Sequence, residues 1–259
     1  MTKNITLDEM VGALIAAYGT SLKAVVLYGS AVRAEQRTGR SDYNLLIVVD
    51  ALDHSRTERI SPAVVRWVSA GNPPPLTFTS GEWRSSGDVF PMEYADVLEA
   101  HRVLHGTLDM SGVEVKLDHL RLQLEQEAMG KLLWLRQGAA IAGADHRART
   151  ELLVAAFSKL LVVLRGLLRF HGERPPHDKS ALVARAAELA NFDAQPLLRV
   201  HESIAGKAPI AAGAGSEGGE GESGALVARV LTALEALVSH VNSFQPASRV
   251  YVATTEEDQ

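Results

Sequence analysis

Two short motifs near the start of the chain contain residue types that can hold phosphate and a metal ion. In the first motif, Gly29 and Ser30 follow the apolar run at residues 22–28. Glycine lets the backbone approach a ligand closely, and N–H groups at the start of a following helix attract anions. The Ser30 hydroxyl can donate to a phosphate oxygen. A Gly-Ser pair alone is common in plain turns, so its meaning depends on the second motif.

The second motif, Asp42 and Asn44, opens the next apolar run, residues 42–49. On a strand, residues two apart share a face and lie about 6.6 Å from each other. Two divalent ions that bridge phosphate oxygens stand about 3.5–4 Å apart, so ligands at this spacing can serve them. Asp50 has the same parity, but eight residues of strand place it roughly 26 Å from Asp42, too far to share an ion.

Together the two motifs resemble the signature of the nucleotidyltransferase superfamily related to DNA polymerase β, especially its minimal and kanamycin nucleotidyltransferase-like members. That signature is an apolar residue, Gly-Ser, a spacer, and Asp-x-Asp on the next strand. The positions that match it are Gly29, Ser30, Arg33, Ser41 and Asp42. The departure is Asn44, which stands where the signature has its second aspartate.

The resemblance implies an activity: transfer of a nucleoside monophosphate from an NTP to a hydroxyl group of a small-molecule or protein acceptor. In such a site the Gly-Ser turn holds the β- and γ-phosphates, and the paired acids hold Mg²⁺ or Mn²⁺. Arg33 and Ser41 are then nucleotide-binding candidates, although a solvated basic turn explains Arg33 equally well. A third carboxylate on a neighbouring strand helps to activate the acceptor hydroxyl, and pyrophosphate leaves.

Two acids in residues 89–100 are candidates for that third carboxylate. The stretch is predicted to be extended, so Glu93 and Asp96, three residues apart, point to opposite faces. Phe90, Met92 and Tyr94 share the face of Asp96, which therefore resembles core. The preferred candidate is Glu93, with Asp96 as the alternative, because a β-bulge would reverse the choice.

Asn44 predicts a weakened site. Its amide oxygen can ligate a hard cation, but it brings no charge to balance a second divalent ion. Either the protein binds nucleotide with one metal and catalyses slowly or not at all, or another acid completes the site; we favour the first. The alternative function is therefore a catalytically degenerate domain that binds a nucleotide or a partner protein, in a regulatory or antitoxin-like role.

The elements that must position these residues suggest an α+β nucleotidyltransferase-like domain at residues 1–110, with a short mixed sheet. It has predicted helices at residues 7–18 and 56–70 and strands at 22–29, 42–49 and 76–80. Thr6 and Glu9 form a capping-box pattern before the first helix. Trp83, in a predicted turn, is the one tryptophan considered for stacking on a base.

From about residue 117 onward, helical periodicity predicts an all-α bundle over residues 115–245, with a flexible Gly/Ser/Glu loop at 211–224 and a tail at 246–259. The most apolar stretch, residues 152–170, is interrupted by Lys159 and Arg165 and predicts a buried helix, with no membrane partner. A net charge of −5 argues against an extended nucleic-acid surface. The chain has no cysteine and no apolar run of signal-peptide type at its N-terminus, so we expect a cytoplasmic protein.

Overall fold

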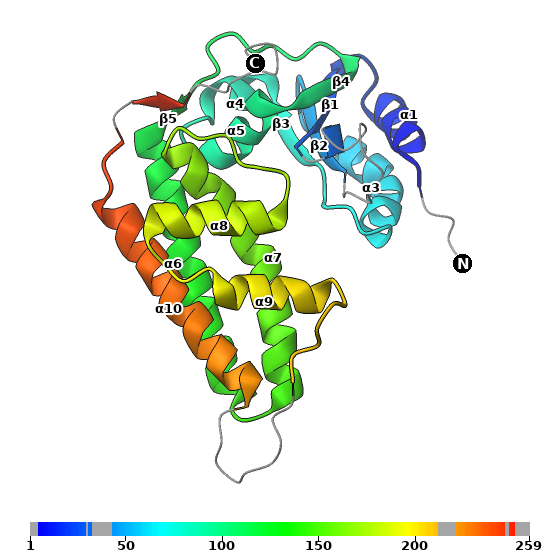
Figure 1. Ribbon diagram of the computed structural model, residues 1–259. Helices are drawn as coiled ribbons and strands as arrows, with labels where there is room; N and C mark the ends of the chain where they lie inside the picture. The colour runs from blue at the N-terminus through cyan, green and yellow to red at the C-terminus, as the bar shows by residue number, and fades with distance from the viewer. Residues whose placement is uncertain (1–4, 30, 33–42, 212–220, 247–248, 252–259) are drawn as a thin grey trace. The chain divides into compact units, whose positions relative to one another are not determined.

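The computed structural model describes residues 5–29, 31–32, 43–211, 221–246 and 249–251. The chain divides into two compact units, the first up to Val115 and the second beginning at Lys116. The first unit is a mixed α/β structure and the second is almost entirely helical, which confirms the predicted fold class (Figure 1).

A four-stranded sheet in the order β3-β2-β1-β4 organises the first unit (Figure 1). The central strand β1 (Leu22–Tyr28) is antiparallel to β2 (Asn44–Val49) and to β4 (His101–Gly106), whereas β2 runs parallel to β3 (Leu76–Thr79). The strands predicted at 22–29, 42–49 and 76–80 are therefore present, and the second is described from Asn44 onward.

One face of this sheet packs against α1 (Leu7–Tyr18) and α3 (His54–Ser69). Residues from both strands and both helices meet in that core, among them Val25, Leu27, Leu45, Ile47, Met10, Leu14 and Trp67. The predicted capping box begins α1: the Thr6 hydroxyl accepts from the Glu9 N–H, and the Glu9 carboxylate accepts from the Thr6 N–H. From Ala24 onward, the odd-numbered residues of β1 and β2 point into this core, so the even-numbered residues of both strands point to the opposite face of the sheet.

The opposite face carries Tyr28, Asn44 and Phe78 and is lined by α4 (Ser80–Ser85) and α5 (Pro91–Glu99). Phe78 meets the rings of Trp83 and Tyr94, each at 6.1 Å between centroids. This aromatic cluster is what holds the two short helices beside the sheet.

The prediction that residues 89–100 are extended is wrong, because most of them form α5. Pro91 is at its first turn, where the missing N–H costs nothing. Its buried residues are Pro91, Met92, Tyr94, Ala95, Val97 and Glu99. In the sequence, the apolar positions 90, 92 and 94 have the period of a strand, but the buried sets 91-94-95 and 92-95-99 have the helical period that the fold uses.

The second unit consists of α6 (Leu117–Ala142), α7 (His146–Phe170), α8 (Lys179–Ala190), α9 (Gln195–Ile204) and α10 (Glu222–Ser243). The three long helices pack side by side, and α8 and α9 lie across α7 (Figure 1). One side of α6 is buried and carries a stripe of apolar residues at helical spacing: Leu117, Leu120, Leu124, Ala128, Leu132 and Leu135. The short strands β5 (Val115–Lys116) and β6 (Val250–Tyr251) pair with each other.

Two helices of this unit are strongly apolar. The stretch at 152–170 forms the inner part of α7 and is mostly buried, as predicted. Among the described helices, α10 alone is long and apolar enough to cross a membrane on length and composition. Its apolar side chains face α6 and α7, so packing within the unit accounts for its composition.

Candidate functional site

The C-terminal end of β1 and the start of β2 bring together one described residue of each sequence motif, Gly29 and Asn44. Gly29 has φ +76° and donates its N–H to the carbonyl of Ala100 at 3.0 Å. A Cβ built at Gly29 would lie 3.4 Å from Nδ2 of Asn44. The glycine of the first motif and the asparagine of the second are thus in contact range across the β1–β2 ladder. The positive φ explains why glycine occupies position 29, because other residues rarely adopt it.

Four of the predicted site residues, Ser30, Arg33, Ser41 and Asp42, lie outside the residues that the structure describes. Their predicted roles come from the sequence alone. The described part of the site therefore consists of Gly29, Asn44 and the groups around them.

Tyr28 is a site residue that the sequence reasoning missed. It is the register partner of Asn44, and directly opposed residues of antiparallel strands project to the same face. The sequence could have indicated this residue: when the two strands are paired with Leu27 opposite Leu45, Tyr28 lies opposite Asn44 and on the same face of the sheet. Burial raises the pKa of Tyr28 above its ordinary range, and the negative charges of Asp96 and Glu93 raise it further.

The negative charges of both candidate acids on α5 therefore reach the same phenol, that of Tyr28. Glu93 and Asp96 are three residues apart on a helix, which places them on neighbouring positions of one side rather than on opposite faces. The strand-parity argument that preferred Glu93 is wrong, since the segment is not a strand. Both acids lie near the sheet face that carries Tyr28 and Asn44, so both remain candidates for the third carboxylate.

The start of β2 is held from the other side of the strand. The N–H of Tyr43 donates to Oδ1 of Asn72 at 3.1 Å, and the Tyr43 ring lies 6.0 Å from that of Trp67. Trp67 belongs to α3 and is fully buried in the core. These contacts anchor the backbone immediately before Asn44, so its position follows from core packing.

Trp83 is a core residue and offers no surface for stacking on a base. It is 2% exposed, its ring stacks on Tyr94 at 4.4 Å, and its Nε1 donates to the carbonyl of Asp109 at 2.8 Å. The predicted turn around it is the helix α4, whose inward side places the indole in the aromatic cluster.

Among the described residues, no group of three or more His, Cys, Asp or Glu side chains can hold a metal ion. A metal at the end of β1 would thus depend on Asp42 in addition to Asn44 and one acid of α5. That donor set, carboxylate and amide oxygen, is the type that Mg²⁺ binds.

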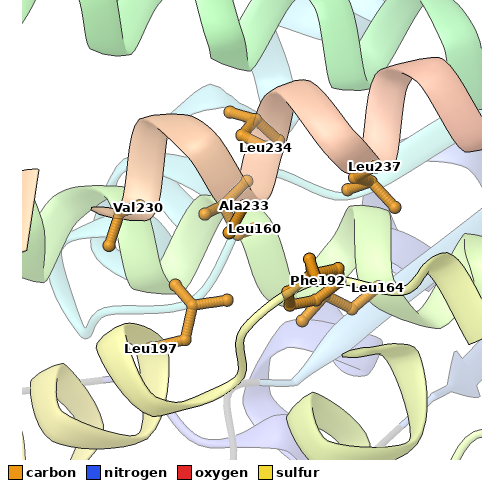
Figure 2. Close-up of a pocket in the computed structure, with 8 residues that line it drawn as sticks. All are labelled: Leu160, Leu164, Phe192, Leu197, Val230, Ala233, Leu234 and Leu237. Carbon is orange, nitrogen blue, oxygen red and sulfur yellow. The ribbon is translucent and has the colours of Figure 1, made fainter. Parts of the chain in front are cut away.

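The helical unit contains a small cavity of a different kind. It is lined only by apolar side chains from α7, α9, α10 and the α8–α9 connection: Leu160, Leu164, Phe192, Leu197, Val230, Ala233, Leu234 and Leu237 (Figure 2). Its free volume of about 10 Å³ is roughly what a single water molecule requires. Because all the side chains that line the cavity are apolar, none of them can bind a polar ligand or take part in catalysis.

Comparison with known proteins gives a structural match without a sequence match. No family model matches the chain, and no curated protein sequence matches it. The chain is similar in structure to spectinomycin adenyltransferase AAD(9) from Enterococcus faecialis, solved with ATP and spectinomycin. The TM-score is 0.52 and the identity 11%, over 88% of this chain and 98% of that one. The likeness shows that this chain shares the fold of that protein, a mixed α/β part with a helical second part.

Proposed function

We propose that this protein binds a nucleoside triphosphate with Mg²⁺ and transfers the nucleoside monophosphate to a hydroxyl acceptor. The observation that carries the proposal is the meeting of Gly29 and Asn44 at the β1–β2 end, on the sheet face that α5 lines with two acids. The fold shared with an adenyltransferase supports it.

In this proposal each residue has a distinct role. The backbone at Gly29, with the hydroxyl of Ser30, holds the β- and γ-phosphates, and Arg33 and Ser41 contact the nucleotide. Asp42 is the main metal ligand and Asn44 a weak, uncharged one. When bound, Mg²⁺ neutralises charge on the phosphates and aligns them for attack at the α-phosphate. Glu93 or Asp96 orients the acceptor hydroxyl and accepts its proton.

The charge that Asn44 lacks is the main weakness of such a site. At about 4 Å and an effective dielectric constant near 20, one charge contributes about 4 kcal/mol. Lost from the transition state, that energy corresponds to a rate lower by roughly a thousandfold. A second acid on α5 offsets part of this loss if both Glu93 and Asp96 act on the metal and the acceptor.

Asn44 also favours a second candidate function, namely a degenerate domain that binds nucleotide or a partner protein without chemistry. Such a protein would keep the phosphate-binding turn at Gly29 and lose transfer. A degenerate domain that binds nucleotide differs from the enzyme in turnover and not in nucleotide affinity.

A labelling assay separates them. The protein is incubated with Mg²⁺ or Mn²⁺ and each α-labelled NTP, first ATP with spectinomycin as acceptor, because the similar structure holds these two molecules. Transfer that is abolished in Asp42→Ala supports the enzyme. Nucleotide binding without transfer, together with transfer gained in Asn44→Asp, supports the degenerate domain. Both candidates are excluded if Asp42→Ala changes neither nucleotide affinity nor transfer.

A further inference from the structure

Two histidine rings meet where α7 and α10 end in the helical unit. His171 follows the last residue of α7, and His240 lies in the last turn of α10. Their Nε2 atoms are 2.8 Å apart, their ring centroids 5.0 Å apart, and their planes inclined by only 15°. The centroid separation equals the N–N distance plus about one ring radius at each end. The rings therefore lie edge to edge, nitrogen to nitrogen, and not one above the other.

This geometry admits one proton between the rings. A neutral imidazole has one N–H and one bare nitrogen, so one Nε2 donates and the other accepts. If both rings were protonated, both Nε2 atoms would carry protons, so that two N–H groups would face each other at 2.8 Å and two positive charges would adjoin. The histidine pair can thus take up one proton on an outer nitrogen and keep its bond, but not a second.

The pair joins the two helix ends through Phe244 as well. The Phe244 ring stacks on His171 at 3.8 Å between centroids and meets Phe170 edge-on at 5.3 Å. Its N–H donates to the His240 carbonyl at 2.8 Å, which closes the last turn of α10. Displacing either imidazole therefore disturbs the packing of Phe244 and the end of α10.

The surroundings favour the neutral form of the pair. Burial lowers the pKa of His171 most; the neighbouring His240 and Arg185 lower it further, and only Glu173 raises it. Glu173 is itself held by Arg185 through two bonds of 2.6 and 2.8 Å, so its charge is largely balanced. Burial likewise lowers the pKa of His240.

We propose that the His171–His240 pair is an acid-sensitive contact that fixes the end of α10 to the end of α7 and releases it when the pair must hold two protons. In the unfolded chain both imidazoles protonate near pH 6.5. The folded unit then binds fewer protons than the unfolded chain, so its stability is full above this pH and falls below it. For one proton of difference, the folded-to-unfolded ratio falls about tenfold per pH unit.

The test compares denaturant unfolding of the full chain between pH 8 and pH 5, followed by circular dichroism. His240→Gln keeps a donor and acceptor near the position of Nε2 but does not titrate. We expect this variant to lose less stability on acidification than the wild type, with the slope reduced by about one proton. His54→Gln is the matched control, because the His54 side chain is 87% exposed, and it should keep the wild-type slope.

Measurements on the wild-type protein test the proposal without relying on the folding of a variant. Imidazole ¹⁵N signals of His171 and His240 should show uptake of the first proton below the pH of a free histidine and no second uptake in the folded state. Amide exchange at Phe244 should accelerate at pH 5 relative to the rest of α10. Independent titration of both rings near pH 6.5, or a wild-type slope in His240→Gln, would overturn the proposal.

Discussion

At the scale of single residues, the candidate site consists of a few side chains and backbone groups around the end of β1. Gly29 adopts a conformation that other residues rarely adopt, with the Asn44 amide close to the place where a side chain would begin. Tyr28, one residue earlier, is partly buried beside two carboxylates on α5, and both its burial and these negative charges raise the pKa of its phenol. A glycine with positive φ, an uncharged amide and two acids of α5 thus surround the end of β1.

Gly29→Ala is expected to destabilise the first unit and to weaken NTP binding. The positive φ of Gly29 costs an L-residue about 1–2 kcal/mol, and the added methyl would lie in van der Waals contact with the Asn44 amide, 3.4 Å from its Nδ2. Chemical denaturation and calorimetric titration with ATP and Mg²⁺ measure both effects. Gly12→Ala in α1 is the matched control; it has open space around it and should stabilise the helix slightly. Unchanged affinity and stability in Gly29→Ala would contradict this account of the turn.

Glu93→Gln and Asp96→Asn decide which α5 acid performs the chemistry. We expect the variant that loses the proton acceptor to reduce the transfer rate by about 100-fold or more, as removal of a general base does, and the other to reduce it by less than about tenfold. Initial rates at saturating NTP are the readout. Glu58→Gln on α3, with a well-exposed side chain, is the control. If both variants transfer at the wild-type rate, α5 takes no part in the reaction.

At the scale of elements, the local sequence pattern allows more than one secondary structure for α5, and tertiary packing decides between them. Residues 89–100 alternate well enough for a strand, yet the aromatic cluster of Phe78, Trp83 and Tyr94 needs a helix to fill the sheet face. In the second unit the apolar sides of α7, α9 and α10 pack together and leave a small cavity between them (Figure 2).

Leu160→Ala is expected to lower the free energy of unfolding of the helical unit by about 2–4 kcal/mol, because it enlarges a cavity that the fold already fails to fill. Leu160 is 3% exposed and lines that cavity. Leu133→Ala on α6 makes the same change at a side chain that is 48% exposed and should cost much less. Equal losses in the two variants, measured by urea denaturation, would show that this part of α7 is not closely packed.

At the scale of the whole molecule, two units with separate cores follow each other along the chain. The sheet core centres on Met10, Leu14 and Val25, and the helical core is built by α6, α7 and α10. Trp67 and Trp83 are in the first unit, whereas Trp134 is in the second.

This division predicts two unfolding transitions that mutations shift separately. In a Trp134→Phe background, fluorescence reports the first unit, and circular dichroism at 222 nm reports mainly the helical one. Met10→Ala, at a fully buried position, should shift the fluorescence midpoint and leave the main dichroism midpoint in place. Leu164→Ala should do the reverse. One shared transition for both probes would contradict independent units.

The sequence by itself determined the class of fold, the strands around Gly29 and Asn44, and the helical stripes, because apolar periodicity over a long segment leaves few ways to bury it. It also identified both α5 acids as candidates. Only the tertiary structure decided that α5 is a helix, that Trp83 is core, and that Tyr28 faces Asn44 and the two acids. Those outcomes depend on which distant segments cover the second sheet face, and a nine-residue stretch with mixed periodicity does not contain that information.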